Sequence, residues 1–379
     1  MHTMDVARQT CEDYLPGLAG KLAAIPLAEL EAADSPALTL FRGAGGPALL
    51  IPKAYTGLAA TPVDAVRVVR ALAAHAPSMA VATTMHHFSV ATLFALADSL
   101  SNSGMEWALL EGIASQNLLV SSGFAEGSSG QNILAPTMQA TAADGGYLIN
   151  GSKKPCSLSR SMDLMTASVA VPDPTGAPTM AVLLIPAATP GITVHPFWAS
   201  NILAGAESDE VRLENVFVPE QLIMRPERGE GGQLDDLQTI GFIWFEMLIT
   251  SCYLGMASNL VERVFRQQKS SATDLVAMGI RLETAALLLE GVARMLEDGD
   301  TGADALARTL LARYGAQDAI TDVARLAVEA LGGMAFINSS EVGYLAAACQ
   351  CVSFHPPSRS RSVDALVAYF GGDILRLDR

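Results

Sequence analysis

A turn-rich stretch in the first half of the chain constrains the fold most. A Gly/Ser-rich loop, Glu126–Asn132, precedes a partly alternating run at Thr137–Ala143. Asp144-Gly145-Gly146 then supplies the residues that a tight hairpin turn needs, because glycine tolerates positive φ. We expect the return strand at Tyr147–Ile149 and a second turn at Asn150-Gly151. The pattern predicts a loop at the mouth of a small antiparallel sheet, where it can contact a ligand; a plain connecting loop is the competing interpretation.

Composition and charge exclude several classes of protein. Of the 379 residues, 50% are hydrophobic and 17% are charged, so the chain can bury a sizeable core. The net charge of −15 and the lack of basic runs argue against nucleic acid, because phosphate binding needs clustered Lys and Arg. The five cysteines have neither metal-ligand spacing nor the pattern of a secreted disulfide framework. The first residues lack an apolar signal region, so we expect a cytoplasmic protein.

The hydrophobic period changes twice along the chain. Helical spacing dominates the first segment, which includes the Ala-rich run Ala80–Ala97 without Asp, Glu, Lys or Arg. Short strand-like runs follow, separated by Pro, Gly and Asp, and helical spacing then returns. We therefore expect an α+β fold with N-terminal helices (1–118), a small central β-barrel or sandwich (119–228) and a C-terminal helical bundle (229–379).

The longest run of low charge is Leu237–Val261, in which Glu246 is the one charged side chain. Its length would permit a membrane span. It nevertheless contains several Thr, Ser and Asn residues and lacks basic flanking asymmetry. A core helix of the bundle is the better interpretation, and we expect no membrane attachment.

Several motifs resemble those of the acyl-CoA dehydrogenase family. Ala125–Asn132 stands where that family has Thr-Glu-Pro-x-x-Gly-Ser-Asp, although the motif is eroded, and Asn150–Lys153 matches its Asn-Gly-x-Lys. Ser157 falls on the hydroxyl residue near the reactive flavin nitrogen. Glu329–Gly333 resembles the Gln-x-x-Gly-Gly that reaches a flavin across a subunit interface, with Glu for Gln. The resemblance implies a homodimer or homotetramer with non-covalent FAD, and it implies these cofactor-binding residues: Phe124, Ala125, Gln131, Ser157, Glu329, Gly332 and Gly333.

The resemblance also implies a reaction, the removal of an α-proton from an acyl thioester while the β-hydride passes to flavin. The substrate would be an acyl-CoA or acyl-carrier protein, and the electrons would go to an acceptor flavoprotein or to oxygen. Two family motifs are absent. Arg266–Lys269 replaces Arg-x-x-Phe-Gly, and Phe354–Pro357 replaces the Glu-Gly-Thr that carries the usual catalytic glutamate. Because a thioester α-carbon is a weak acid, another base must then serve, and His355 is one candidate.

Glu246 is the first candidate for that base. Some family members carry their base on the first helix of the C-terminal bundle, and an unpaired buried carboxylate is costly unless it is used. Counting back from Gly255 without a gap, however, places Phe245 on that position, and adjacent helix residues differ by about 100° in direction. The competing interpretation pairs Glu246 with a core arginine such as Arg313 or Arg325.

Two functions from other classes stay open. A flavin-dependent monooxygenase or oxidase on the same fold needs no carboxylate base, and the lost base motif favours it. A non-catalytic binding relative would have lost the flavin. The intact Asn150–Lys153 motif and Ser157 argue against that last interpretation.

Overall fold

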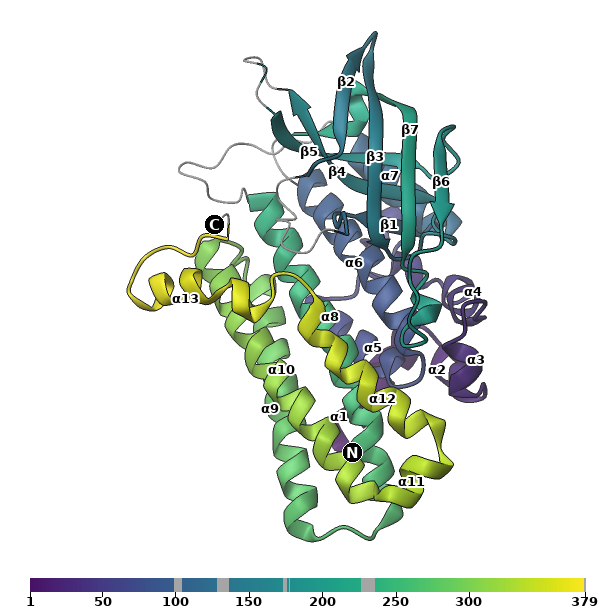
Figure 1. Cartoon of the computed structure of the whole chain (residues 1–379), viewed down its shortest axis with the longest axis vertical. Coiled ribbons are helices and arrows are strands. Elements are labelled where there is room, and N and C mark those ends of the chain that lie inside the picture. The colour runs from purple at the N-terminus through teal and green to yellow at the C-terminus, as the bar shows by residue number, and fades with distance from the viewer. Residues whose placement is uncertain (99–103, 128–135, 173–175, 177, 226–235, 378–379) are drawn as a thin grey trace.

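Helices, one twisted sheet and a second set of long helices follow one another along the chain (Figure 1). The computed structural model describes residues 1–98, 104–127, 136–172, 176, 178–225 and 236–377. The predicted α+β class is confirmed. The predicted boundary at residue 118 falls in the short connection between α7 and β1, and the one at residue 228 lies outside the described residues.

Prolines mark the ends of several N-terminal helices. These helices are α1 (His2–Tyr14), α2 (Leu18–Ala23), α3 (Leu27–Leu30), α4 (Ala37–Gly43), α5 (Pro62–Ala73), α6 (Pro77–Ala97) and α7 (Met105–Gln116). Pro16 separates α1 from α2, as its missing N–H predicts. Thr61 and Asp64 form a capping box at the start of α5. Apolar residues surround α6 on every side, so it is a core helix.

The strands form a single eight-stranded sheet in the order β6-β7-β3-β2-β4-β5-β8, with β1 paired to β4. They are β1 (Val120–Gly123), β2 (Gln139–Ala143), β3 (Gly146–Cys156), β4 (Leu164–Pro172), β5 (Pro178–Pro186), β6 (Ile192–His195), β7 (Asp209–Pro219) and β8 (Ile223–Met224). The β2–β3 hairpin turns at Asp144-Gly145, as predicted.

The second predicted turn, at Asn150-Gly151, is wrong. Strand β3 continues through it, and the register against β7 shifts between Ile149 and Gly151, which makes a β-bulge. Gly151 has a φ of +146°, and a Cβ there would lie 2.7 Å from Met138 Cγ. The glycine therefore permits a bulge and a close approach rather than a chain reversal.

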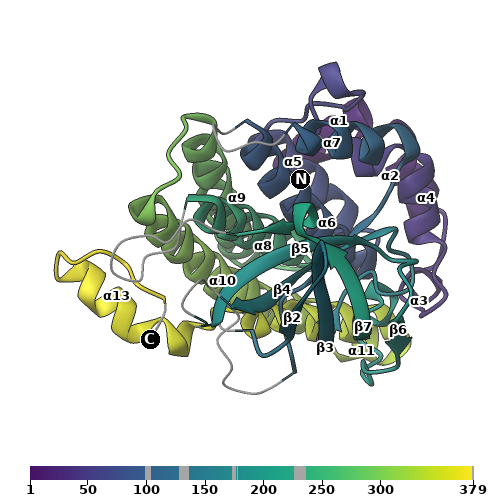
Figure 2. The same cartoon turned by 90° about the horizontal axis from the view of Figure 1, so that it is seen from above.

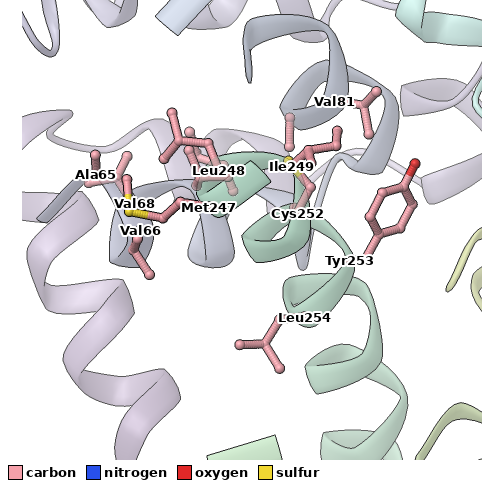
Figure 3. Close-up of a cluster of buried hydrophobic side chains, with 14 of the residues drawn as sticks. Ala65, Val66, Val68, Val81, Met247, Leu248, Ile249, Cys252, Tyr253 and Leu254 are labelled. Atoms are coloured by element: carbon pink, nitrogen blue, oxygen red, sulfur yellow. The ribbon is translucent and has the colours of Figure 1, made fainter. Parts of the chain in front are cut away.

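Helix α8 (Asp236–Gln267) is the central helix of the C-terminal bundle. It contacts α5 and α6 as well as its neighbours in the bundle. The other elements of the C-terminal part are α9 (Ala272–Glu297), α10 (Ala303–Leu331), α11 (Gly333–Asn338), α12 (Ser340–Gln350), the 3₁₀ turns η6 (Cys351–Phe354) and η7 (Arg359–Arg361), and α13 (Val363–Phe370). A Cβ at Gly255 would lie 2.3 Å from the Arg70 carbonyl oxygen, so α5 and α8 meet this closely only with glycine there. Figure 3 shows Met247 and Leu248 of α8 beside Val66 and Val68 of α5.

Within the described residues, α6 and the Gln238–Gln267 part of α8 are long and apolar enough to span a membrane by length and composition. In the most apolar 18-residue stretch of each helix, 78% of the residues in α6 and 72% of those in α8 are buried inside the protein. Burial by other helices is what a core helix of a bundle shows, as the sequence predicts for Leu237–Val261.

Candidate active site

An aromatic cluster lies where the three groups of elements meet. It consists of Phe88 on α6, Phe124 after β1, Phe245 on α8 and His355 after η6, and we call it the aromatic site. The ring centroids of Phe88 lie 6.5 Å from those of Phe124 and 5.4 Å from those of Phe245. Phe245 and His355 are 5.9 Å apart. All four side chains are half-buried, and α6 and α8 lie side by side next to the sheet (Figures 1 and 2).

A buried histidine fixes β1, the strand that leads into this site. His86 Nδ1 accepts a hydrogen bond from the Val120 N–H at 3.1 Å, and its Nε2 lies 2.9 Å from the Pro47 carbonyl oxygen. Burial lowers the pKa of His86 to about 4, so the ring is neutral and carries one donor and one acceptor. His86 is therefore a hydrogen-bonded core residue that joins α6 to the sheet.

Three of the predicted cofactor residues come together beside β1. The Ser121 hydroxyl donates to the Ser157 carbonyl at 2.6 Å, and the Lys154 N–H donates to the Ala125 carbonyl at 2.8 Å. Phe124, Ala125 and Ser157 therefore border the same corner of the sheet. The Ser157 and Ser208 hydroxyls lie 3.0 Å apart, and a pair of hydroxyls that shares one hydrogen bond keeps one O–H free to donate. Gln131 lies outside the described residues.

A buried ion pair joins Glu126 to strand β3 beside this corner. Lys153 Nζ lies 2.6 Å from Glu126 Oε1, and the two side chains are 0% and 5% exposed. The Glu126 carboxylate also accepts from the N–H groups of Thr137 and Met138. Both charged residues belong to the motifs that the sequence pointed to, but their pairing was not predicted, because 26 residues separate them and either could have faced a ligand.

Glu246 points away from the aromatic site, toward α10. Its side chain is 0% exposed, and its Oε2 lies 2.7 Å from Nε of Arg313, which is 1% exposed. Burial raises the pKa of Glu246 above its ordinary value, and the Arg313 charge only partly opposes this shift. The neighbouring residue Phe245 faces the site instead, as the count back from Gly255 implies. The geometry favours the pairing with a core arginine that the sequence left open, and the role of Glu246 as a base stays a prediction.

His355 is the polar member of the aromatic site. Its Nε2 lies 2.6 Å from the Tyr253 hydroxyl, and in Figure 3 that hydroxyl points away from the cluster between α5 and α8. His355 is half-buried, and the protein around it lowers its pKa to about 3, with Arg313 adding to the shift. The ring is therefore neutral at ordinary pH. As a base for a thioester α-proton, His355 stays a prediction.

The remaining predicted cofactor residues lie at the other end of the bundle. Glu329 is 61% exposed and pairs with Arg325 at 2.7 Å, and added Cβ atoms at Gly332 and Gly333 would meet open space. In Figure 1 they lie between α10 and α11, far from the sheet. One chain does not bring them to Ser157, and their contact with a flavin across a subunit interface stays a prediction.

Comparison with known proteins is consistent with this arrangement. Residues 121–216 match the acyl-CoA dehydrogenase middle domain, and residues 257–354 match the acyl-CoA dehydrogenase C-terminal domain. The chain is 51% identical to isobutylamine N-hydroxylase of Streptomyces viridifaciens, in an alignment of 378 residues that covers 100% of both chains. The crystal structure of nitrososynthase from Micromonospora carbonacea var. africana superposes with a TM-score of 0.82 at 18% identity over 96% of each chain. FMN-bound TdsC from Paenibacillus sp. A11-2 gives 0.80 at 17% identity over 100% of each.

The relatives revise the function expected from the sequence. They agree with flavin-dependent oxidation in general, and they support the monooxygenase alternative better than the dehydrogenation of an acyl thioester, which was the main prediction. The family itself is established by the domain matches and by a relative that shares half of its residues along the whole chain. The chain therefore belongs to the acyl-CoA dehydrogenase family of flavin-dependent oxidoreductases.

Proposed function

We propose that this protein is a flavin-dependent monooxygenase that hydroxylates the nitrogen of a small aliphatic amine. The observation that carries the proposal is the register of α8, where Phe245 faces the aromatic site and the adjacent Glu246 pairs with Arg313. Removal of an α-proton needs a positioned base, but hydroxylation of an amine nitrogen does not. The identity to isobutylamine N-hydroxylase supports the amine as the substrate class.

The proposed reaction balances with reduced flavin as the source of electrons. One atom of O₂ replaces an N–H bond with an N–O–H group, and the other leaves as water. The two electrons and two protons come from the reduced flavin, which becomes oxidised. The amine must present its lone pair, so it has to bind without its extra proton. Since an aliphatic ammonium loses its proton near pH 10 in water, a poorly hydrated aromatic site helps by disfavouring the charged form.

Within the aromatic site, we assign the amine nitrogen to His355. A neutral imidazole held by Tyr253 can exchange a hydrogen bond with an uncharged amine, and it brings no charge that would favour an ammonium ion. The phenyl rings of Phe88, Phe124 and Phe245 give the alkyl group an apolar surface. Small branched alkyl chains suit such a surface because removing their apolar area from water is favourable.

The corner of the sheet beside β1 fits a flavin. Ser157 has a hydroxyl partner in Ser208 that leaves one O–H to donate, and the backbone of Phe124 and Ala125 borders the same corner. These residues would hold the cofactor, which supplies the electrons that activate oxygen. We propose FAD as its form, as the family resemblance implies.

We also propose that the working unit is a homodimer or a homotetramer built from two dimers. Glu329, Gly332 and Gly333 are open to another subunit. Close to them on α11, Met334, Phe336 and Ile337 are 67%, 51% and 74% exposed, and a second chain would cover them. Light scattering at micromolar concentration tests this, since a monomer with stoichiometric flavin would contradict it.

An isotope experiment tests the activity. Purified protein is mixed with reduced FAD, isobutylamine and ¹⁸O₂, and we expect a hydroxylamine that carries one ¹⁸O atom. In parallel, the protein with oxidised FAD is mixed anaerobically with butyryl-CoA, and we expect no loss of flavin colour. Bleaching by the thioester without hydroxylamine formation would restore acyl dehydrogenation. A protein that binds no flavin, even after reconstitution, would be a non-catalytic relative.

A further inference from the structure

Arg313 connects Glu246 to the segment that carries His355. From α10 its Nε faces Glu246, and its Nη2 donates to the carbonyl oxygens of Val352 and His355 at 2.9 Å and 3.0 Å. Its Nη1 donates to Gln317 Oε1 at 3.1 Å. The guanidinium thus makes three hydrogen bonds and one ion pair, which a lysine cannot reproduce from a single ammonium nitrogen.

The two carbonyl oxygens fix the backbone on both sides of Phe354. They lie at the end of η6, where carbonyl groups have no partner within the turn, and a buried cation satisfies them. Just beyond, the Tyr314 hydroxyl donates to the Pro357 carbonyl at 2.9 Å. Helix α10 therefore holds the backbone of this segment from Val352 to Pro357.

Helix α8 holds the side chain of the same histidine. Tyr253 bonds to its Nε2 and Phe245 packs against its ring, while Glu246 fixes the arginine that holds its backbone. On the function proposed above, we infer that Glu246 and Arg313 are positioning residues that set the place of His355 in the substrate site. Glu246 acts through Arg313, and neither residue contacts the amine.

Stability alone does not account for the pair. Replacing a buried ion pair with well-packed apolar side chains is often neutral or stabilising, because both charges lose hydration. A pair that only filled the core would therefore be dispensable. The position of His355 is what this pair adds, since an apolar residue at 313 has no donor for the two carbonyl oxygens.

The sharpest test is Arg313→Lys, which keeps the positive charge and removes the fork of donors. We expect the His355 ring to leave Tyr253, and its pKa, followed by NMR of labelled histidine, to rise toward 6.5. His355→Gln assigns the signal among the six histidines. We also expect the ratio of hydroxylamine to hydrogen peroxide formed per oxygen consumed to fall about tenfold, the scale of effect of a slightly misplaced group.

Arg70→Lys is the matched control. Arg70 is also buried, at 4% exposed, and it contacts α8 through Ser258, but it does not touch the segment around His355. We expect this control to keep the wild-type histidine titration and product ratio, even if its melting temperature falls. A titration and a product ratio of Arg313→Lys that match those of Arg70→Lys would overturn the inference.

If Arg313→Lys does not fold, the double variant Glu246→Leu/Arg313→Met removes both charges together. Its readout is a crystal structure, in which the His355 ring is expected away from Tyr253. An unmoved ring would overturn the inference. The proposed function is tested separately by the wild-type protein, because the position of the ring can be read whether or not an amine is hydroxylated.

Discussion

Two buried ion pairs, one beside the sheet and one in the bundle, differ in how they are completed. The Glu126 carboxylate accepts from Lys153 and from the backbone N–H groups of Thr137 and Met138. Glu246, by contrast, makes an ion pair but no aligned hydrogen bond with any described residue. In the first pair the carboxylate organises the backbone, and in the second the cation does. Burial of a glutamate beside a cation therefore does not by itself reveal what the ion pair does. Its structural role depends on whether the carboxylate or the cation forms hydrogen bonds to the backbone.

The largest expected effect comes from removing the pair beside the sheet. In Glu126→Leu/Lys153→Met, the buried Met138 N–H loses its acceptor and the buried Ser168 hydroxyl loses its donor, and such groups cost about 1–3 kcal/mol each. We therefore expect the free energy of unfolding to fall by about 3–5 kcal/mol, measured by denaturant titration. Wild-type stability in this double variant would show that these two buried groups find other partners.

Glu31 shows what a buried carboxylate does when its partners are neutral. It is 3% exposed and accepts from the Ser78 N–H at 3.0 Å, the Ser78 hydroxyl at 2.5 Å and the Tyr344 hydroxyl. Burial raises the pKa of Glu31 to about 7, and the hydrogen bonds only partly oppose this. Ionising Glu31 therefore costs the folded state free energy that a nearby cation would offset.

The consequence is a pH dependence of defined sign. Since the folded pKa of Glu31 lies above the ordinary value of 4.5, the folded state binds more protons, and its contribution to stability is lost as pH rises from about 4.5 to 7. We expect Glu31→Gln to reduce this fall in the free energy of unfolding by about 3 kcal/mol. The measurement is the difference between the unfolding free energies of variant and wild type across this pH range. Glu29→Gln, on the exposed side of α3, is the control. Plots of unfolding free energy against pH that run parallel for Glu31→Gln and wild type would contradict the raised pKa of Glu31.

A smaller effect is expected at the corner that the Glu126 pair supports. Ser157→Ala removes one hydroxyl donor to the flavin, and a single hydrogen bond contributes about 1 kcal/mol, so FAD affinity should fall several-fold in equilibrium titration. Ser159→Ala is a control in the same loop, because that hydroxyl donates to the Glu207 carbonyl at 2.7 Å. Equal FAD affinities in the two variants would place Ser157 outside the flavin site.

The smallest effect is expected from the pair in the bundle. Glu246→Leu/Arg313→Met should unfold within about 1 kcal/mol of wild type, because the half-buried segment released from residue 313 can turn its two carbonyl oxygens toward water. Arg313→Met alone should lose about 3–5 kcal/mol by leaving a buried charge unpaired. Thermal or denaturant unfolding of both variants measures this contrast. A double variant as unstable as the single one would remove the distinction between the two pairs.

The sequence predicts much of this structure where local chemistry decides it. Pro62 starts a helix, and Asp144-Gly145 turns a hairpin, because their backbone preferences act without help from distant residues. Asn150-Gly151 has the same turn chemistry but makes a bulge, because its strand stays paired with β7. Strand pairing is a tertiary contact that no local pattern contains.

The candidate site shows the same limit. Helix α8 is apolar on most sides, so its sequence does not reveal which face meets the substrate, and Glu246 could be read either way. Arg313 was one of two arginines proposed as its partner, while Arg325 pairs with Glu329 at the surface. The contact between Tyr253 and His355 spans 102 residues, so no spacing pattern could have predicted it.

The one-residue step from Phe245 to Glu246 has a consequence for how substrate range can change. On the function proposed above, because the two side chains leave α8 in different directions, a substitution at 245 would alter the volume open to the alkyl group without touching Arg313. Tryptophan or alanine at that position would favour shorter or longer amines on an unchanged scaffold. Single mutations at position 245 could thus change the range of substrates that related proteins accept, while position 246 stays constrained by its contact with Arg313.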